Sequence, residues 1–256
     1  MVISSVGNIE LQNITLSYKN GTGTRTIIED LSLRFPSGSF TSLIGTSGCG
    51  KSTLLNAIGG HCKPTSGHII LDGVDIKGPN AELGIVFQQH TLFPWKTVKE
   101  NVRFGPMQRG IGKSESNKLA DGFISLVGLS GFEDYYPKML SGGMQHRVEI
   151  ARSLANKPAV LLMDEPFGAL DAQMRAMLQE SLISIWKNTN VTIIFVTHDV
   201  EEALLLSQRV VIIPRHAGAI PTIIETNRDY SISREEYLFK EATKNLKSQC
   251  LSYLVA

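Results

Sequence analysis

The sequence predicts an α/β fold: an antiparallel β layer, then a core with buried parallel strands, into which an α-helical subdomain is inserted. Three observations predict it. Residues 9–35 alternate between apolar and polar side chains, as strands with one buried face do. Residues 160–163 and 191–197 are short apolar runs suited to fully buried parallel strands. The stretch 91–158 has fewer β-branched runs and more helical spacing than the rest of the chain.

Composition limits the function classes. The chain has 256 residues, enough for one large domain with a subdomain and a substantial core. Its 25 Lys and Arg residues nearly balance its 24 Asp and Glu residues, which argues against a nucleic-acid-binding surface. The apolar runs are too short to span a bilayer, and the first residues lack the charge of a secretion signal. The 3 cysteines have no metal-binding spacing and fit a reducing compartment, so we expect a cytosolic protein.

The expected elements follow in chain order. Residues 9–14 and 27–35 alternate as strands, and the glycine-containing turn at 20–23 lets the chain reverse between them. Helices are expected around 116–127 and 144–155 because apolar residues recur there at helical spacing. These helices form the insertion, and the core is therefore divided in sequence around it.

A glycine-rich motif, G-x-x-x-x-G-K-S, directly follows the apolar run 40–44. The glycines let successive backbone N–H groups surround phosphates, because no Cβ atom stands in the way. The residues after the motif have helical spacing, so the phosphates would meet a helix N-terminus, where the dipole favours anions. We predict a nucleoside triphosphate site here; the alternative is a glycine-rich turn without a ligand. The nucleotide-binding residues are expected to be Gly45, Thr46, Ser47, Gly48, Cys49, Gly50, Lys51, Ser52 and Thr53.

Two side chains of this phosphate loop have expected chemical roles. Lys51 is placed to reach the outer phosphates, and the Ser52 hydroxyl to ligate Mg²⁺. Cys49 occupies a variable position of the motif and is interpreted as a small tolerated residue.

Both buried apolar runs end in polar residues that hydrolysis would need. Ligands of open α/β sheets collect at the carboxyl ends of strands. Asp164 is placed to hold Mg²⁺, and Glu165 to polarise the attacking water as general base. His198 can donate to the terminal phosphate. Alone, an Asp-Glu pair is more often a solvated loop and a single histidine more often structural.

A second glycine-flanked helix start lies in the insertion, where Leu140-Ser141-Gly142-Gly143-Met144 precedes apolar residues at helical spacing. Ser141 and the amides of Gly142 and Gly143 would form a second phosphate-facing helix N-terminus. One phosphate cannot use both cradles of a single subunit if they lie at opposite ends of the insertion. Two copies meeting head to tail are therefore expected; the alternative is a flexible turn with Ser141 as N-cap.

With these motifs in this order, the chain resembles the ATP-binding cassette (ABC) ATPases over most of its length. The resemblance implies an ABC-type P-loop NTPase core with ATP and Mg²⁺ as cofactors. It implies that Tyr18 stacks on adenine, and that Gln88 ligates Mg²⁺ and senses the γ-phosphate. It also implies that Asp171 lies at a dimer seam, and that Ser141 and Gly143 contact the partner's nucleotide. From spacing alone, Tyr18 could be a half-buried strand aromatic and Gln88 an ordinary loop amide.

The resemblance also implies a division of the chain. The ATPase domain is expected over residues 1–230, with its core at 1–90 and 159–230 and the helical subdomain at 91–158. Residues 231–256 are expected to form a short packed helical tail, because Ser233 begins a capping box.

A finer resemblance is to the importer ATPases for nitrate, sulfonates and taurine, with taurine closest, and rests on residues 78–88, 92–95 and 163–173. It implies a homodimer at the cytoplasmic face of the inner membrane, bound to membrane permease subunits and served indirectly by a solute-binding protein. The apolar run 92–95 is expected to dock a coupling helix of the permease. The alternative for this run is a proline-fixed turn that packs on its own subdomain.

The chain departs from the usual family pattern beside the signature segment, residues 140–144. Met144 replaces the commoner glutamine, Gln145-His146 stand where Arg-Gln is frequent, and Glu149 stands where a small residue is frequent. These changes affect side-chain hydrogen bonds near the signature segment and leave Ser141 intact.

Two other functions are weighed. A soluble ABC ATPase of an assembly complex, such as iron–sulfur assembly, would have the same motifs but no permease. A small-molecule kinase or GTPase would leave the motif at Ser141 unexplained, and residues 156–159 lack the aspartate with which GTPases commonly read guanine.

Overall fold

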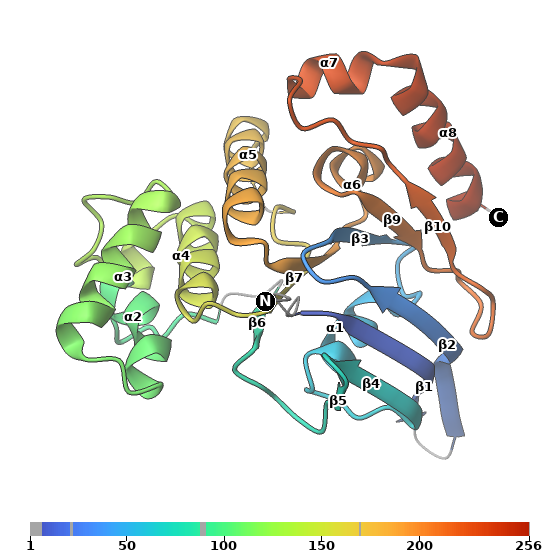
Figure 1. The fold of residues 1–256 in the computed structure, drawn as a ribbon, viewed down its shortest axis with the longest axis horizontal. Coiled ribbons are helices and arrows are strands. Elements are labelled where there is room, and N and C mark those ends of the chain that lie inside the picture. Colours follow the sequence, from blue (N-terminus) through green and yellow to red (C-terminus); the bar gives the residue numbers. More distant parts are fainter. Residues whose placement is uncertain (1–6, 21–22, 88–90, 169, 256) are drawn as a thin grey trace, which may run out of the picture. The chain divides into compact units, whose positions relative to one another are not determined.

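The computed structural model describes residues 7–20, 23–87, 91–168 and 170–255. These residues form two compact units (Figure 1). Unit 1 comprises residues 1–80 and 190–256, and unit 2 comprises residues 81–189. The phosphate loop lies in unit 1 and the signature segment in unit 2.

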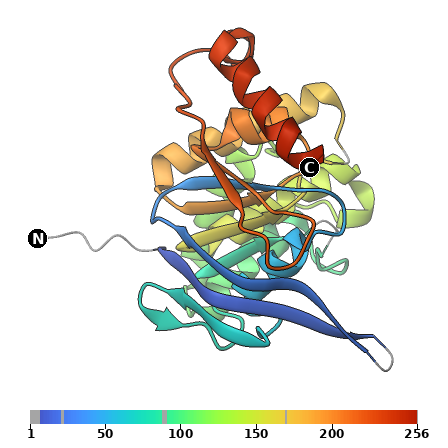
Figure 2. The same cartoon turned by 90° about the vertical axis from the view of Figure 1, so that its right-hand side faces the viewer.

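Unit 1 begins with an antiparallel sheet in the order β2-β1-β4-β5. The strands are β1 Ile9–Asn20, β2 Gly23–Phe35, β4 Ser66–Leu71 and β5 Val74–Asp75. Figure 2 shows β1 and β2 side by side as a long pair. Their alternation breaks between Leu11 and Ile14, where a register shift with Asn13 at φ +49° turns Ile14 back to the buried face. The expected antiparallel layer is thus present.

The second sheet of unit 1 carries the phosphate loop. The strands are β3 Phe40–Ile44, β8 Thr192–Val196, β9 Arg209–Ile212 and β10 Thr222–Glu225. β3 lies between β8 and β9 and is parallel to both, whereas β10 pairs antiparallel with β9. β3 and β8 are buried along their whole length, as the continuous apolar runs predict.

Helices pack on this second sheet and form a hydrophobic core with it. They are α1 Lys51–Ile58, α6 Val200–Leu206, α7 Arg234–Phe239 and α8 Glu241–Val255. Ile44 of β3 packs in one cluster with α6, Tyr237 of α7 and Cys250 of α8. The C-terminal tail therefore consists of two helices, separated at Lys240, whose ψ of 136° is not helical.

Unit 2 combines a parallel strand pair with helices. The strands are β6 Leu83–Val86 and β7 Val160–Asp164, and the helices are α2 Val98–Gln108, α3 Lys113–Leu126, α4 Gly142–Ala155 and α5 Ala172–Thr189. A 3₁₀ turn, Pro137–Met139, precedes α4. Helices α2, α3 and α4 pack together (Figure 1). α2 begins with a complete capping box between Thr97 and Glu100.

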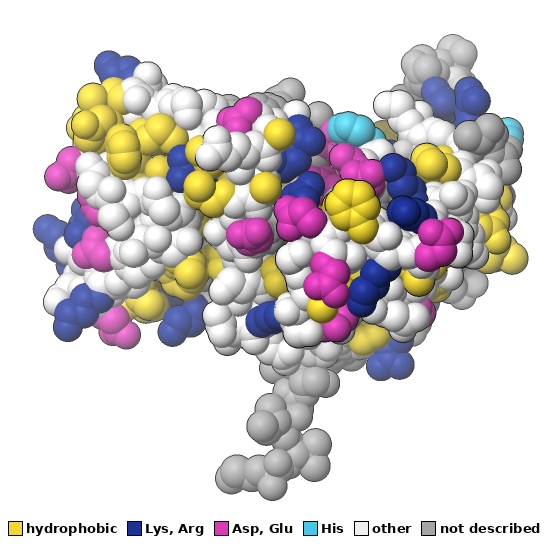
Figure 3. All heavy atoms as spheres, turned by 90° about the horizontal axis from the view of Figure 1, so that it is seen from above, with side chains coloured by type: hydrophobic (Ala, Val, Ile, Leu, Met, Phe, Trp, Pro, Cys, Tyr) yellow, Lys and Arg dark blue, Asp and Glu magenta, His cyan; other side chains and the backbone are white. Residues whose placement is uncertain are grey.

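The surface agrees with the balanced composition. On the face seen in Figure 3, basic and acidic side chains are interspersed, and neither charge forms a continuous stretch. In the part of the chain that the structure describes, no helix has the length and apolar character needed to cross a membrane.

Candidate functional site

The phosphate loop connects β3 to α1 in unit 1. Gly50 is the N-cap of α1 with φ +104°, and Gly48 has φ +80°. Glycine adopts such angles freely, whereas an L-residue does so only at a cost. A Cβ atom on Gly50 would also lie 2.6 Å from Cγ2 of Ile27 on β2. No side-chain hydrogen bond caps α1, so its N-terminus offers backbone amides, which is how helices bind phosphate.

Lys51 holds the loop from inside. Its side chain is only 7% exposed, and its Nζ donates to the carbonyl oxygens of Gly45 at 2.8 Å and Thr46 at 3.1 Å. A buried ammonium group needs such partners, because an unpaired buried charge is costly. The lysine therefore fixes the loop's shape and places a positive charge within it. Ser52 and Thr53 follow on the first turn of α1.

Cys49 is a packing residue of the loop. It is buried, and its Sγ lies 3.8 Å from Nζ of Lys51. A Cβ atom on Gly45 would lie 2.6 Å from this sulfur and 2.7 Å from the carbonyl oxygen of Ile213, so the loop has no space for a side chain at position 45. Ser47 and Gly48 are exposed at the tip of the loop.

Tyr18 of β1 is linked to the same helix through Cys62. The Cys62 thiol donates to the carbonyl oxygen of Thr53 at 3.8 Å. Burial raises the pKa of Cys62, and a hydrogen bond with Tyr18 acts in the opposite direction. Tyr18 is 47% exposed, so its ring can accept a flat ligand near the phosphate loop.

His198 lies at the edge of the sheet where β3 ends. Val196 at the end of β8 is in parallel register with Leu43 of β3, two residues before the phosphate loop. The neighbours of His198 are fixed: the Thr197 hydroxyl donates to Glu202 at 2.5 Å, and Asp199 caps α6. The exposed imidazole of His198 therefore lies between two residues that are held in place, Thr197 and Asp199. It lies at the edge of the sheet where β3 ends and the phosphate loop begins.

Asp164 and Glu165 lie at the end of β7 in unit 2. Asp164 is 8% exposed, and Glu165 follows with φ +45°, a left-handed conformation that costs a non-glycine residue of the order of 1–3 kcal/mol. Such strain is common at catalytic positions. The carbonyl oxygen of Glu165 accepts from the amide of Gly168 at 3.3 Å, which closes the turn.

The signature segment forms the N-terminus of α4. The Ser141 hydroxyl accepts from the backbone N–H of Met144 at 3.3 Å, so Ser141 is the N-cap. Gln145 Nε2 donates to the carbonyl oxygens of Pro137 and Leu140 at 3.1 Å and 3.2 Å and ties the preceding turn to the helix. Ser141 and Gly142 are exposed at this end.

Asp171 lies close to the signature segment within unit 2. Its Oδ1 accepts from the amide of Met174 at 3.0 Å at the start of α5. A Cβ atom on Gly143 would lie 2.8 Å from Cδ2 of Leu170, the residue before Asp171. The structure thus brings Gly143 and the Asp171 segment together.

The predicted site residues are divided between the units. Unit 1 brings together the phosphate loop, Tyr18 and His198, and unit 2 holds Asp164, Glu165, Asp171 and the signature segment. Gln88 lies outside the described residues. In the described ranges there is no cluster of three or more His, Cys, Asp or Glu side chains that could hold a metal alone. Sequence reasoning missed Cys62 and Glu202. Cys62 contacts both Tyr18 and Thr53, and Glu202 accepts a hydrogen bond from Thr197. No sequence motif connects these residues.

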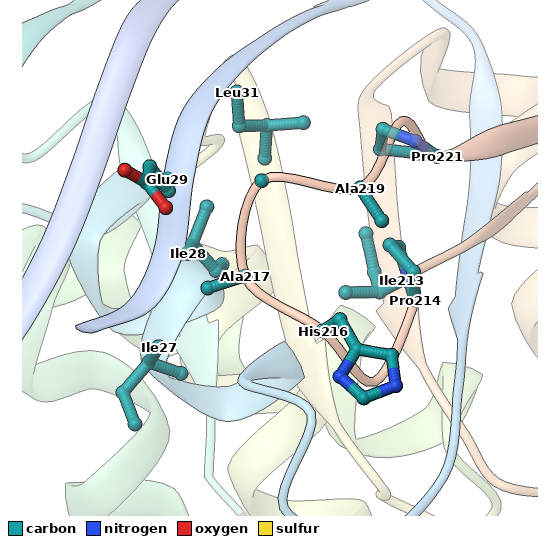
Figure 4. Close-up of a pocket in the computed structure, with 11 residues that line it drawn as sticks. Ile27, Ile28, Glu29, Leu31, Ile213, Pro214, His216, Ala217, Ala219 and Pro221 are labelled. Atoms are coloured by element: carbon teal, nitrogen blue, oxygen red, sulfur yellow. The ribbon is translucent and has the colours of Figure 1, made fainter. Parts of the chain in front are cut away.

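Two cavities in unit 1 are lined by residues between Ile212 and Thr222. Figure 4 shows one, between Ile28 of β2 and the 214–221 loop; its volume of about 20 Å³ holds about one water molecule. The other has a volume of about 450 Å³, and of the phosphate loop only Thr46 lines it. The first cavity is too small for a nucleotide, and the second includes too little of the loop to be assigned as its pocket.

Comparisons with known proteins show which family the chain resembles. Residues 28–168 match the family model described as ABC transporter. The chain is similar to three curated import ATP-binding proteins: for taurine from Roseobacter denitrificans (46% identity, 83% of this chain and 80% of that one), for nitrate from Synechocystis (43%, 91% and 91%) and for aliphatic sulfonates from Bacillus cereus (42%, 94% and 95%).

A solved structure has the same fold. It is a dimeric ATP-binding cassette in a post-hydrolysis state bound to ADP and phosphate. Its TM-score with this chain is 0.78 at 31% sequence identity, and the match covers 86% of this chain and 100% of that one. The predicted α/β fold class is therefore confirmed.

Proposed function

Because the chain belongs to the ABC transporter family, we propose that it is the ATPase subunit of an importer for a small anionic solute of the taurine, alkanesulfonate or nitrate type. ATP binding and ATP hydrolysis are the activity of this family and of this chain. The import role and the solute class are supported by the functions named for three relatives with 42–46% identity.

The observation that carries the proposal is the phosphate loop with its internal lysine. The loop offers a helix N-terminus, glycine-only backbone angles and a buried ammonium group held by Gly45 and Thr46. Each of these features favours a polyanion with a chain of phosphates. When ATP binds, Lys51 is expected to exchange its carbonyl partners for phosphate oxygens.

The oxygen donors fit a magnesium ion. The Ser52 hydroxyl lies exposed on the first turn of α1, and the Asp164 carboxylate ends a buried strand. Hydroxyl and carboxylate oxygens are the ligands that Mg²⁺ prefers, together with nucleotide oxygens and water. We assign Ser52, Asp164 and Gln88 to this ion, which would neutralise charge on the phosphates during hydrolysis.

Glu165 is assigned as the general base and His198 as a donor to the terminal phosphate. A carboxylate on a strained strand end is suited to accepting a proton from an attacking water. An exposed imidazole can donate a hydrogen bond as charge moves onto the leaving phosphate.

The second half of each site is assigned to a partner copy of the chain. Ser141, Gly142 and Gly143 present a helix N-terminus that can contact the phosphates held by the other subunit's loop. The dimeric cassette bound to ADP and phosphate, at 31% identity, supports such a pair. Asp171, beside Gly143, would then lie near the dimer seam.

Residues 92–95 are assigned to contact with a permease. Trp95 is 71% exposed, while Phe93 packs on Phe104 with ring centroids 4.7 Å apart. The run is a turn closed by a hydrogen bond from Lys96 N to Phe93 O, and it is anchored on its own unit while it displays one large apolar ring. Both sequence interpretations of this run are therefore compatible with it, and an exposed, anchored aromatic ring is suited to a protein interface.

The assembly that follows is a homodimer bound peripherally to permease subunits at the cytoplasmic face of the membrane, with a solute-binding protein outside. We retain the domain boundaries as part of this proposal: core at 1–90 and 159–230, helical subdomain at 91–158 and tail at 231–256. Closure on ATP and opening after hydrolysis would move the permease between its two states.

Growth of a deletion strain tests the import role. Loss of growth on taurine or alkanesulfonate as the only sulfur source, or on nitrate as the only nitrogen source, is expected, with restoration by the wild-type gene and not by the Glu165→Gln variant. Co-purification with a membrane permease is expected as well. Normal growth on all three solutes, or isolation with soluble scaffold proteins alone, would contradict the import role and favour an assembly ATPase.

A further inference from the structure

The turn at residues 91–96 of unit 2 is held by side-chain hydrogen bonds from α2. The Asn101 side chain of α2 accepts from the amide of Phe93 at 2.8 Å. Its Nδ2 donates to the carbonyl oxygens of Phe93, Lys96 and Thr97 at 3.2 Å, 3.0 Å and 3.0 Å. Asn101 is fully buried, so these bonds are shielded from water. The turn is therefore a rigid part of unit 2.

A buried carboxylate of the signature helix holds the first residue of this turn. Glu149 on α4 is 1% exposed. Its Oε1 accepts a short hydrogen bond from the backbone N–H of Thr91 and one from the Thr91 hydroxyl at 3.2 Å. Its Oε2 lies 3.9 Å from Nε2 of the buried His146. Burial of a carboxylate is tolerated only with such partners.

Arg152, one turn further along α4, completes the contact. Its guanidinium donates to the carbonyl oxygen of Thr91 at 2.8 Å and to the Thr91 hydroxyl at 2.6 Å, and lies 5.6 Å from the Phe93 ring centroid. Burial lowers the pKa of Arg152, and the charge of Glu149 acts in the opposite direction. All polar groups of Thr91 are thus engaged by two charged side chains of one helix.

The same helix also holds the chain on the other side of residues 88–90. The Ser153 hydroxyl donates to the carbonyl oxygen of Ile85 on β6 at 3.0 Å. Next in the chain, Val86 is in register with Met163 of β7, the residue before Asp164. α4 therefore contacts both flanks of the short stretch that carries Gln88, and the upstream flank is paired with the strand that carries the proposed Mg²⁺ ligand.

We propose that Glu149 is a positioning residue for ATP hydrolysis: with Arg152, it anchors Thr91, three residues after Gln88, to the signature helix. Thr91 is three residues from Gln88, and a chain spans at most about 3.6 Å per residue, so the anchor limits where residue 88 can reach. Contact between a nucleotide and Ser141 would then be coupled through α4 to the chain next to Gln88.

The proposal rests on the ATPase activity and on the assignment of Gln88, and it does not depend on the import role. The purified full-length dimer without permease is therefore the right material. Failure of the growth tests would leave it intact.

Three variants test it. Glu149→Ala removes the carboxylate, Glu149→Gln keeps its shape and one acceptor oxygen, and Thr91→Val removes the hydroxyl that both charged side chains contact. Glu180→Gln, at an exposed position of α5 in the same unit, is the matched control. The measurements are kcat, KM for ATP, the Mg²⁺ concentration that gives half-maximal activity, and the fraction of protein that binds a fluorescent ATP analogue.

The expected result is a fall in kcat of about tenfold or more for Glu149→Ala, in line with the effect of a misplaced catalytic group. KM for ATP should change little, because the phosphate loop lies in unit 1, while the Mg²⁺ requirement should rise. Glu149→Gln should recover part of the activity, and the Thr91→Val effect should be smaller in the Glu149→Gln background than in the wild type.

Either of two results would overturn the proposal. One is a loss of activity that merely follows the loss of analogue-binding protein, which would make Glu149 a stability residue. The other is wild-type kcat and Mg²⁺ dependence in folded Glu149→Gln and Thr91→Val.

Discussion

The helix N-termini of the phosphate loop and of the signature segment, α1 and α4, are built differently. α1 in unit 1 starts at a glycine with φ +104°, has no side-chain cap, and follows a loop that is held by a buried lysine. α4 in unit 2 starts at Ser141 with φ −66° and ψ 159°, and the serine hydroxyl already accepts from the amide of Met144. The first helix end has no side-chain cap and follows a loop that contains a buried ammonium group, whereas the second has one amide capped by serine.

This difference predicts separate roles for the two helix ends, one in binding ATP and one in hydrolysing it. A phosphate at α1 would meet open amides and an ammonium group, which favours binding in the ground state. A phosphate at α4 would meet a helix end where the amide of Met144 is already bonded to Ser141, so fewer amides are left to bind it. We therefore expect variants of unit 1 to change ATP affinity and variants of unit 2 to change turnover.

Glu165→Gln, in unit 2, is expected to have the largest effect on turnover. The amide cannot accept the proton of the attacking water, so kcat should fall by roughly 10²-fold or more, while ATP affinity is kept. A stable ATP-bound dimer should accumulate, detectable by size-exclusion chromatography with ATP and Mg²⁺. Near-normal steady-state ATPase in this variant would remove Glu165 from the role of base.

Lys51→Ala tests the expected role of unit 1 in ATP affinity. Loss of a charge-assisted contact with phosphate, of the order of 1.5–3 kcal/mol, should weaken ATP binding about 10- to 10²-fold. The carbonyl oxygens of Gly45 and Thr46 would also lose their donor, so the nucleotide-free protein should unfold at a lower temperature. Equilibrium titration with an ATP analogue and thermal unfolding measure the two effects. Unchanged affinity would show that the loop binds phosphate without its lysine.

Gly143→Ala should act on turnover in unit 2. The added Cβ would lie 2.8 Å from Cδ2 of Leu170, so Leu170 and its neighbour Asp171 must shift. We expect kcat to fall about tenfold with unchanged ATP affinity. Gly112→Ala is the matched control, because a Cβ atom there meets nothing within 4 Å. Equal effects of the two substitutions would argue against a role for the signature segment.

Tyr18→Ala is expected to have the smallest effect. Loss of a stacking partner at a half-exposed site should weaken ATP affinity about fivefold, at the low end of the 1–3 kcal/mol of base stacking. Tyr18→Phe keeps the ring and should bind ATP like the wild type. If Tyr18→Phe is as weak as Tyr18→Ala, the hydroxyl and its bond to Cys62 matter more than stacking.

Local motifs explain what the sequence could predict. The strand before the phosphate loop, the helix after it and the strand that ends at Asp164 all appear where the apolar runs place them, because each pattern is complete within about 15 residues. The helix expected around 116–127 is observed as α3, Lys113–Leu126. Shifts of this size at helix ends are ordinary.

Contacts between distant residues explain what the sequence could not predict. α2 was not expected, although Thr97 and Glu100 carry the capping-box signal that could have revealed it; Pro106 near its end obscures the helical pattern. The burial of Glu149 depends on Thr91, 58 residues earlier in the chain. The tie between Tyr18 and Thr53 likewise passes through Cys62, so no local pattern could indicate it.

The central claim is that each ATP site combines the phosphate loop of one subunit with the signature helix of the other. Mixing two variants at an ATP concentration too low for Lys51→Ala to bind tests it most directly. Lys51→Ala weakens ATP binding by the loop, and Gly143→Asp puts a carboxylate where phosphate is expected. In a mixed dimer one site carries both defects and the other carries neither. After equal mixing, single-turnover ATP hydrolysis should return to about a quarter of the wild-type amplitude, because about half of the dimers are mixed and each has one intact site. Activity no higher than the average of the two variants alone would contradict the shared site.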